Sequence, residues 1–243
     1  MTNGYRLSSG GQINRSESVS FKFNGKTLYG YKGDTLASAL LANGIHLVGR
    51  SFKYHRPRGI YTCGIEEPNA LVQIISEHNE PNTRATIKRV YDGMEIVSQN
   101  RWPSLNYDFG AINNILSPIF SAGFYYKTFM GPKGFWKNLY EPLIRRSAGL
   151  GKPPKNFRSK STHQYHNTDV VIIGAGLSGL SAAKKFINTK YKVLLIEQDK
   201  YLGGILKNSN KIKTINGMTP QEWISETEEL ILNSKNITIL KNT

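Results

Sequence analysis

The 243-residue sequence has a single cysteine, Cys63, and few acidic residues, with 17 Asp and Glu against 32 Lys and Arg. One cysteine excludes an internal disulfide, so a reducing compartment is acceptable. No segment approaches the roughly 20 consecutive apolar residues that span a bilayer, and the N-terminus has no apolar signal core. Repeats at solenoid lengths are also lacking. These absences predict a cytoplasmic protein of one or two domains with no membrane partner.

The shortage of acidic residues leaves a formal net charge of +15. Lys and Arg gather at residues 53–58 and between residues 127 and 160, partly among aromatic residues. Aromatic and basic side chains together occur on nucleic-acid surfaces, but no RNA- or DNA-binding module pattern accompanies them here. We therefore predict no nucleic-acid partner and assign the charge to an acidic partner subunit or to anionic ligands.

The most informative segment is a β-branched run at residues 170–173, after Asp169, that leads into a G-x-G-x-x-G turn. The run predicts a buried parallel strand, and residues 180–188 predict a helix after the turn. Gly174 permits the tight turn, Gly176 lets a pyrophosphate approach the backbone, and Gly179 lets the helix pack closely on the sheet. The pyrophosphate would rest on free N–H groups at the start of the helix. The segment therefore predicts a dinucleotide site.

An acidic residue ends the next predicted strand, residues 193–197. Glu197 lies about 20 residues beyond the turn, where a carboxylate binds an adenosine ribose and repels a 2′-phosphate, which favours NAD or FAD over NADP. An unoccupied Rossmann-like turn is the alternative. Gly203 and Gly204 predict a second turn near the nucleotide, with a plain loop as the alternative. The predicted cofactor-binding residues are Gly174, Ala175, Gly176, Leu177, Ser178, Gly179, Glu197, Gln198, Gly203 and Gly204.

The C-terminal segment adds one helix and one short strand. Thr219, Pro220 and Glu222 predict a capping box at the start of that helix, and residues 237–240 predict the strand. Doubly wound domains need further strands. We therefore expect an incomplete Rossmann-type domain over residues 167–243, and hence a fragment of a longer chain.

Residues 17–100, after a tail of residues 1–16, predict a β-grasp domain. Asp34 is the expected cap of its helix, which ends near residues 43–44. The expected strands are residues 19–23 and 26–31, joined at Asn24-Gly25, and residues 70–75 and 85–90. The order resembles the ferredoxin-like domain that holds a [2Fe–2S] cluster, which requires four cysteine ligands. Because Cys63 cannot supply four thiolates, we expect the fold without the metal. We expect Cys63 to be a partly buried small side chain, with a reactive thiol as the alternative.

Residues 101–166 predict a proline-punctuated linker with short helices at residues 111–116 and 135–146. Its aromatic residues, among them Phe124, Tyr125, Tyr126, Phe129 and Trp136, either cover their own protein or form an apolar patch for a partner subunit. His163 and His166 are too few for a zinc site, and His55 is expected in a solvated loop. No catalytic residue and no metal ligand is predicted.

Several segments taken together resemble the α subunit of heterotetrameric sarcosine oxidase, over nearly the whole chain. The segments are Arg6-Leu7 with Gly10-Gly11, residues 33–44, 48–59, 66–72, 98–104, 124–130 and 144–151, and the glycine turn. The resemblance implies the N-terminal part of a flavin-dependent complex that demethylates sarcosine to glycine and reduces oxygen to hydrogen peroxide.

The resemblance also implies the cofactors and partners of such a complex. NAD would bind the Rossmann-type domain, with FAD possible at the same motif, whereas FMN and tetrahydrofolate would belong only to the complete complex. The implied partners are the β, γ and δ subunits and a small secondary amine substrate, and the chain alone is expected to be inactive. The alternatives are a related amine or opine dehydrogenase subunit and a non-catalytic nucleotide-binding assembly module.

Overall fold

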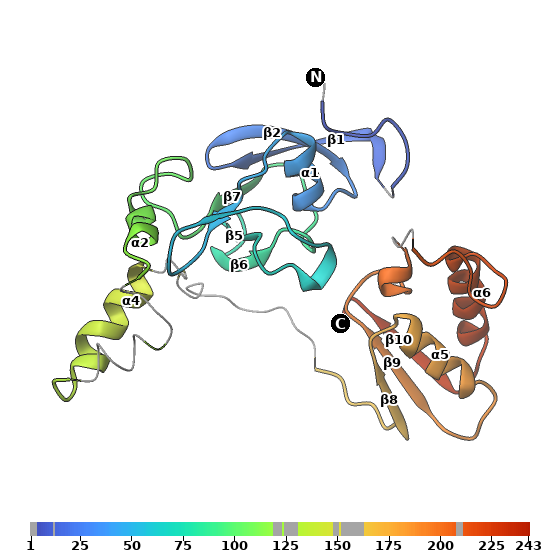
Figure 1. Ribbon diagram of the computed structural model, residues 1–243. Helices are drawn as coiled ribbons and strands as arrows, with labels where there is room; N and C mark the ends of the chain where they lie inside the picture. Colours follow the sequence, from blue (N-terminus) through green and yellow to red (C-terminus); the bar gives the residue numbers. More distant parts are fainter. Residues whose placement is uncertain are drawn as a thin grey trace. The chain divides into compact units, whose positions relative to one another are not determined.

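The computed structural model contains two compact units, residues 1–159 and residues 160–243 (Figure 1). The structure describes residues 4–11, 13–118, 123, 131–147, 151, 163–207 and 211–243. The aromatic cluster predicted at residues 124–129 and the linker residues 152–160 lie outside these described residues. Within them, no helix is both long and apolar enough to cross a membrane.

Unit 1 begins with a hairpin of two strands, β1 Asn14–Phe23 and β2 Lys26–Lys32, which pair antiparallel. Asn24 and Gly25 connect them with φ angles of 51° and 81°. Two successive left-handed residues make the type I′ turn that an Asn-Gly pair favours. The hairpin prediction is confirmed.

A five-stranded mixed sheet is the framework of unit 1. The hairpin joins β5 Leu71–Ile74, β6 Glu80–Arg84 and β7 Met94–Ser98 in the order β2-β1-β7-β5-β6, with β1 and β7 parallel and the other pairs antiparallel. Helix α1, Leu36–Ala42, contributes Leu36 and Leu40 to the core, where both are fully buried together with Ile74 and Ile96. The strand order is that expected of a β-grasp.

The strand predicted at residues 85–90 is wrong. These residues form a turn, with an isolated bridge between Arg89 and Thr35. The carbonyl oxygens of Ala85 and Lys88 instead accept the N–H groups of Ala37 and Leu36, at 2.8 and 2.7 Å. Because the first N–H groups of a helix have no partner within the helix, this turn satisfies the start of α1 rather than extending the sheet.

The cap of α1 is also displaced by one residue from the prediction. Thr35, not Asp34, is the N-cap, and its hydroxyl accepts the N–H of Ser38 at 3.2 Å. Asp34 is 1% exposed and pairs with the Arg6 guanidinium at 2.6 Å. Asp34 therefore fixes the N-terminal segment to the sheet instead of capping the helix.

The loop that carries Cys63 is organised by a buried carboxylate. Glu67 follows the short helix η1, Gly64–Glu66. It is 1% exposed, and its two oxygens accept four backbone N–H groups at 2.6 to 3.0 Å, those of Tyr61, Thr62, Asn69 and Ala70. Because the loop closes around this carboxylate with its backbone inward, Cys63 is exposed and the prediction that it is partly buried is wrong.

The buried Glu67 carboxylate should make the stability of unit 1 sensitive to acid. Burial raises the pKa of Glu67, but the four N–H donors outweigh burial and bring it below its ordinary value of 4.5. A carboxyl with a lowered folded pKa stabilises the protein above its unfolded pKa, and this stabilisation is lost as pH falls through the folded pKa. We expect the free energy of unfolding to fall below about pH 4.5 more steeply for the wild type than for Glu67→Gln, which lacks that carboxylate. Urea unfolding across the acidic range measures both slopes, and equal slopes would contradict the assignment.

One pair of short strands and several helices complete unit 1. β3 Gly49–Arg50 pairs antiparallel with β4 Pro57–Arg58. The segment after the sheet holds η2 Phe109–Ala111, α2 Ile112–Ile115, the π-helical turn η3 Trp136–Tyr140 and α4 Glu141–Ser147. These helices occupy the segments in which the sequence predicts short helices.

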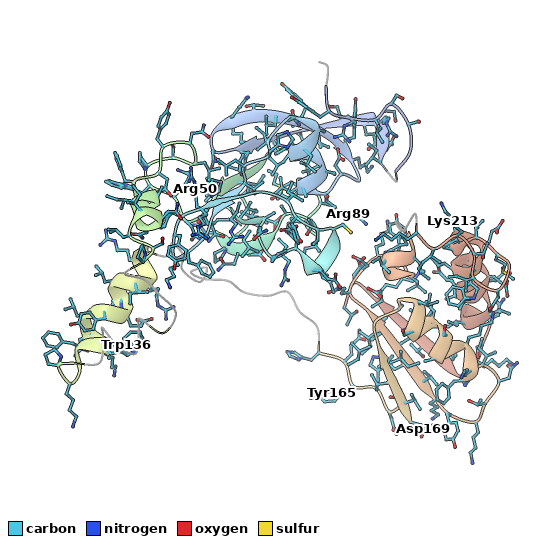
Figure 2. The ribbon with its side chains drawn as sticks, in the orientation of Figure 1. Arg50, Arg89, Trp136, Tyr165, Asp169 and Lys213 are labelled. Atoms are coloured by element: carbon cyan, nitrogen blue, oxygen red, sulfur yellow. The ribbon has the colours of Figure 1, made fainter. Side chains whose placement is uncertain are left out.

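Unit 2 is a fragment of parallel sheet with helices packed on it. β8 Val170–Ile173, β9 Val193–Glu197 and β10 Ile237–Lys241 are all parallel, in the order β10-β9-β8. Asp169 lies just before β8 (Figure 2). Its carboxylate accepts the N–H of Lys192 at 2.8 Å and so links the starts of β8 and β9.

The helices of unit 2 pack on this sheet through a common core. α5 Leu177–Lys185 contributes Leu180, and α6 Pro220–Leu232 contributes Trp223 and Ile231, all nearly or fully buried with Leu195. The predicted capping box of Thr219 and Glu222 is present, with Pro220 at the first helical position. α5 begins three residues earlier than predicted, so that it starts directly from the glycine turn.

Candidate functional site

The glycine turn of unit 2 joins the end of β8 to the start of α5. Gly174 has a φ of 90°, which favours glycine, and its N–H donates to the carbonyl oxygen of Ile196 at 2.7 Å. Gly176 is the N-cap of α5, and no side chain caps this helix end. A Cβ built at Gly176 would meet nothing within 4 Å. The backbone at this helix start is therefore open to a ligand.

The Glu197 carboxylate lies against the same turn. Its Oε2 accepts the N–H of Ala175 at 2.6 Å, and its Oε1 accepts the N–H of Asp199 at 2.9 Å. Glu197 is 7% exposed. Each carboxylate oxygen has capacity for a second donor. Glu197 therefore shapes the turn and keeps lone pairs available to hydroxyl groups of a ligand.

The second glycine pair lies beside the first. η4, Gly204–Lys207, begins at this pair. The N–H of Gly203 donates to the carbonyl oxygen of Ala175 at 2.7 Å, and a Cβ at Gly204 would lie 3.2 Å from the Cα of Gly176. The second glycine pair therefore touches the first glycine turn directly, which a loop unrelated to the turn would not do.

The structure brings most of the predicted residues together. Leu177, Ser178 and Gly179 form the first turn of α5, directly after Gly176. Gln198 is exposed after β9 and makes no hydrogen bond to the turn within the described part of the chain. The arrangement offers N–H groups at a helix start for a pyrophosphate and the Glu197 carboxylate for a ribose.

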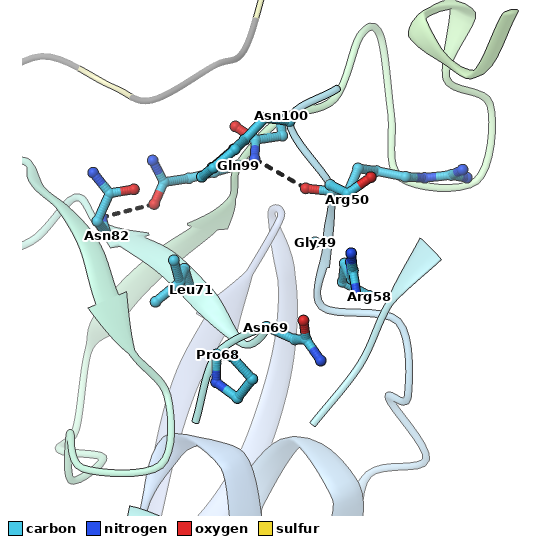
Figure 3. Close-up of a pocket in the computed structure, with 11 residues that line it drawn as sticks. Gly49, Arg50, Arg58, Pro68, Asn69, Leu71, Asn82, Gln99 and Asn100 are labelled. Atoms are coloured by element: carbon cyan, nitrogen blue, oxygen red, sulfur yellow. Dashed lines mark hydrogen bonds between the residues drawn. The ribbon is translucent and has the colours of Figure 1, made fainter. Parts of the chain in front are cut away.

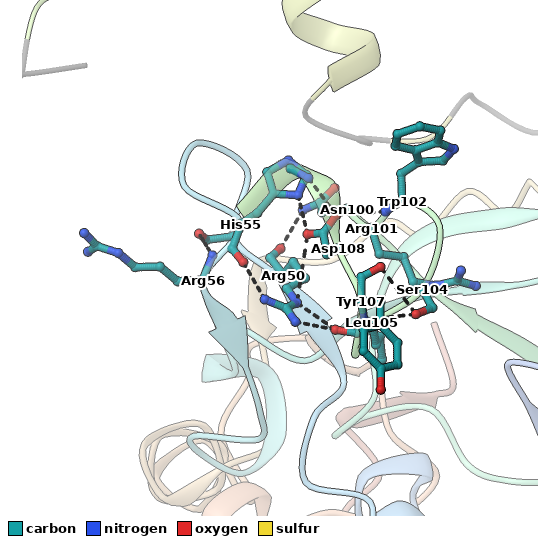
Figure 4. Close-up of polar contacts among 12 residues, drawn as sticks. Arg50, His55, Arg56, Asn100, Arg101, Trp102, Ser104, Leu105, Tyr107 and Asp108 are labelled. Carbon is teal, nitrogen blue, oxygen red and sulfur yellow. Dashed lines mark hydrogen bonds and ion pairs between the residues drawn. The ribbon is translucent and has the colours of Figure 1, made fainter. Parts of the chain in front are cut away.

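Unit 1 contains a buried polar cluster that sequence reasoning missed (Figure 4). The Oδ2 of Asp108 lies 2.6 Å from His55 Nδ1 and 4.0 Å from Arg50 Nε, and the three side chains are 0, 7 and 9% exposed. The other Asp108 oxygen accepts the N–H groups of Trp102 and Gly110, at 2.9 and 3.2 Å. Arg50 also donates to the carbonyl oxygens of His55 and Leu105. The cluster ties residues 50–55 to residues 102–110.

His55 was expected in a solvated loop, and the structure corrects this. The residue is 5% exposed, with a φ of 52°, and its ring packs against Gly110 so closely that a Cβ there would lie 2.3 Å from Nδ1. Asp108 lies 53 positions away in the chain. No short sequence pattern predicts a hydrogen-bond partner that far along the chain.

A pocket of about 120 Å³ lies beside this cluster (Figure 3). Its lining residues include Gly49, Arg58, Asn69, Gln99 and Asn100. Asn100 donates to the carbonyl oxygen of Arg50 at 2.9 Å, while its buried Oδ1 has no hydrogen-bond partner among the described residues. The pocket therefore lies next to a buried acceptor that the described residues leave unpaired.

Two family models match the chain. One describes a 2Fe-2S iron-sulfur cluster binding domain and matches residues 16–101, and the other describes the Thi4 family and matches residues 156–219. The residues do not fit a [2Fe–2S] cluster, because Cys63 is the only cysteine in the sequence and the cluster needs four thiolate ligands or two with two histidines. Within the described ranges, no three His, Cys, Asp or Glu side chains gather as a group that could hold a metal ion.

The chain is similar to curated proteins and to a solved structure. It is 47% identical to sarcosine oxidase subunit alpha of Rhizobium meliloti (strain 1021) and 29% identical to that of Corynebacterium sp. (strain U-96), over 98 and 96% of this chain. It spans 24 and 20% of the length of these relatives. The L-proline dehydrogenase of P. horikoshii matches 94% of this chain and 34% of its own, with a TM-score of 0.52 and 22% identity, which supports the mixed α/β fold alone. The chain is therefore similar to sarcosine oxidase α subunits over about a fifth to a quarter of their length.

Proposed function

We propose that this chain is part of a subunit of a flavin-dependent oxidoreductase complex that oxidises a secondary amine, with sarcosine as substrate, and that unit 2 binds an adenine dinucleotide. The similarity to sarcosine oxidase subunits supports the reaction class. The β, γ and δ subunits are the proposed partners. The described residues of this chain contribute binding rather than the reacting groups of amine oxidation.

One contact carries the dinucleotide proposal. The hydrogen bond from Ala175 N–H to Glu197 brings the acid at the end of β9 onto the glycine turn at the end of β8. In doubly wound domains these two strand ends form the place where the pyrophosphate and the adenosine ribose bind. The parallel order β10-β9-β8 supports the first part of such a domain over residues 167–243.

The proposed ligand is the adenosine diphosphate moiety that NAD and FAD share. The turn and the start of α5 would bind the pyrophosphate, and Glu197 would accept hydrogen bonds from the ribose hydroxyls. Binding of this moiety would hold the rest of the cofactor, whose nicotinamide or flavin group carries the redox chemistry. A carboxylate at position 197 also disfavours a 2′-phosphate, so NADP is expected to bind more weakly than NAD.

Glu197→Gln tests this assignment. The substituted amide would retain one acceptor oxygen but lose the charge and one acceptor, and hydrogen bonds to charged groups contribute about 1.5–3 kcal/mol. We therefore expect the dissociation constant for NAD or FAD to rise about 10-fold to 100-fold. Calorimetric titration with NAD, FAD, ADP-ribose and NADP measures this, and the relative affinities for NAD and FAD identify the cofactor.

Glu229→Gln is the matched control, because Glu229 is an exposed acid of the same unit on α6. It should bind all four ligands as the wild type does. Unchanged affinity in Glu197→Gln would remove Glu197 from the site, and no binding of any dinucleotide by the wild type would remove the dinucleotide proposal.

A further inference from the structure

The segment after the sheet of unit 1 exposes several large apolar side chains. Trp102, Phe109, Ile112 and Ile115 are 68, 65, 59 and 78% exposed. The Trp102 and Phe109 rings are in contact, with centroids 5.1 Å apart. Phe109, Ile112 and Ile115 recur at three-residue intervals along η2 and α2, a spacing that places side chains on one side of a helix. We name these four residues the apolar patch. Clustered exposed apolar side chains of this kind mark interaction surfaces.

The charges next to the apolar patch are of one sign. Lys53 and Arg56 lie over the Tyr54 ring, 5.0 and 4.6 Å from its centroid. Arg56 Nε also donates to Asn114 Oδ1 at 2.7 Å, which joins this basic edge to the helix that carries the patch. Asp108 is the only acidic residue in residues 50–58 and 101–116, and its carboxylate is fully buried. A partner with exposed carboxylates is therefore complementary to this surface.

The buried polar cluster fixes both segments beneath this surface. His55 belongs to the basic segment, and the Trp102 and Gly110 N–H groups belong to the segment of the patch, yet all three contact Asp108 (Figure 4). Arg50 adds hydrogen bonds to Leu105 in the second segment. Side chains held in place before binding lose less conformational entropy when a partner arrives. The backbone that carries the exposed Trp102 ring is thus held in place, and Trp is a residue type that dominates protein interfaces.

We infer that the apolar patch and its basic edge, Lys53 and Arg56, bind a partner protein subunit that offers an apolar pocket bordered by acidic residues. The inference rests on the proposed role of the chain as a subunit of a larger oxidoreductase. Ile112 and Ile115 give no stacking surface for bases, whereas an apolar centre with Trp and Arg is typical of protein interfaces.

Two variants test the surface in the complete α chain, titrated with the separately purified β, γ and δ subunits. Phe109→Ser/Ile115→Ser removes half of the patch, and Arg56→Glu reverses one charge of its edge. An interface anchor contributes at least about 2 kcal/mol, so we expect each variant to weaken binding by about 30-fold or more. For the wild type, affinity should also fall as ionic strength rises. The controls are Ile87→Ser and Lys22→Glu, exposed residues elsewhere in unit 1.

The possible results distinguish failure of the proposed surface from failure of the proposed function. Wild-type affinity in both patch variants would overturn the surface and leave the proposed function standing, whereas no binding of any subunit by the wild type would overturn both. Wild-type binding to single-stranded DNA or to vesicles of anionic phospholipid that Arg56→Glu abolishes, without an effect on subunit binding, would overturn the choice of a protein partner. Unfolding midpoints and dinucleotide affinity verify folding, and if the double variant unfolds, Arg56→Glu carries the test.

Discussion

Gly179→Ala is expected to destabilise unit 2 by about 3 kcal/mol and to abolish dinucleotide binding. A Cβ at Gly179 would lie 1.9 Å from the carbonyl oxygen of Gly174. Both groups belong to the backbone, so α5 must move away from the turn to make room. Overpacking usually costs about 1–3 kcal/mol, and a neighbour that cannot rotate aside places this site at the upper end. Urea unfolding and calorimetric titration measure the two losses.

Gly176→Ala is the matched control for this prediction, because the same change meets open space at position 176. Its backbone is extended, with φ −75° and ψ −168°, which any residue adopts. We expect the free energy of unfolding to change by less than about 1 kcal/mol, while the added methyl group obstructs the pyrophosphate and weakens binding. Equal stability of Gly179→Ala and the wild type would refute the close packing of α5 on the turn.

Asp108→Ala is expected to destabilise unit 1 by about 3–5 kcal/mol. The substitution leaves the Arg50 guanidinium without its buried ion-pair partner and His55 Nδ1 without its hydrogen-bond partner, at side-chain exposures of 9 and 7%. It also deprives the N–H groups of Trp102 and Gly110 of their acceptor. Unpaired buried polar groups carry the full cost of their lost hydration. Urea unfolding monitored by circular dichroism gives the change in free energy.

Asp108→Asn and Glu66→Gln complete the comparison. The asparagine keeps one side-chain oxygen for the N–H groups of Trp102 and Gly110, so we expect a smaller loss than for alanine. Glu66 is an exposed acid of the same unit, and its change should remain within about 0.5 kcal/mol of the wild type. A loss of less than about 1 kcal/mol in Asp108→Ala would show that the cluster does not stabilise the unit.

The features that the sequence predicts correctly depend on residues close together in the chain. The Asn24-Gly25 turn and the Thr219 capping box each need a pairing of side chain and backbone within four positions. The glycine turn at residues 174–179 likewise forms where its local spacing places it. For such features, local stereochemistry is sufficient because no distant partner competes with it.

Three of the errors occur where a distant segment supplies the partner. Asp is a favoured residue type at a helix N-cap, but Asp34 pairs with Arg6, and Thr35 is the N-cap instead. His55 lies in a segment with the composition of an exposed basic loop, but it is buried in contact with Asp108, 53 residues away. Residues 85–90 are apolar enough for a strand, but their carbonyl groups bind the start of α1. Tertiary contacts decided each case, and no short window of sequence contains them.

The Glu67 carboxylate bears on how the loop at residues 61–70 can form in the cell. In a ferredoxin the loop at this place is assembled around iron, so its maturation depends on iron supply and on delivery of the cluster. Here four backbone N–H groups converge on a carboxylate that the chain itself encodes. The loop therefore needs no iron to close, because its central group folds with the polypeptide. Acid, which protonates that carboxylate, is the condition expected to loosen it.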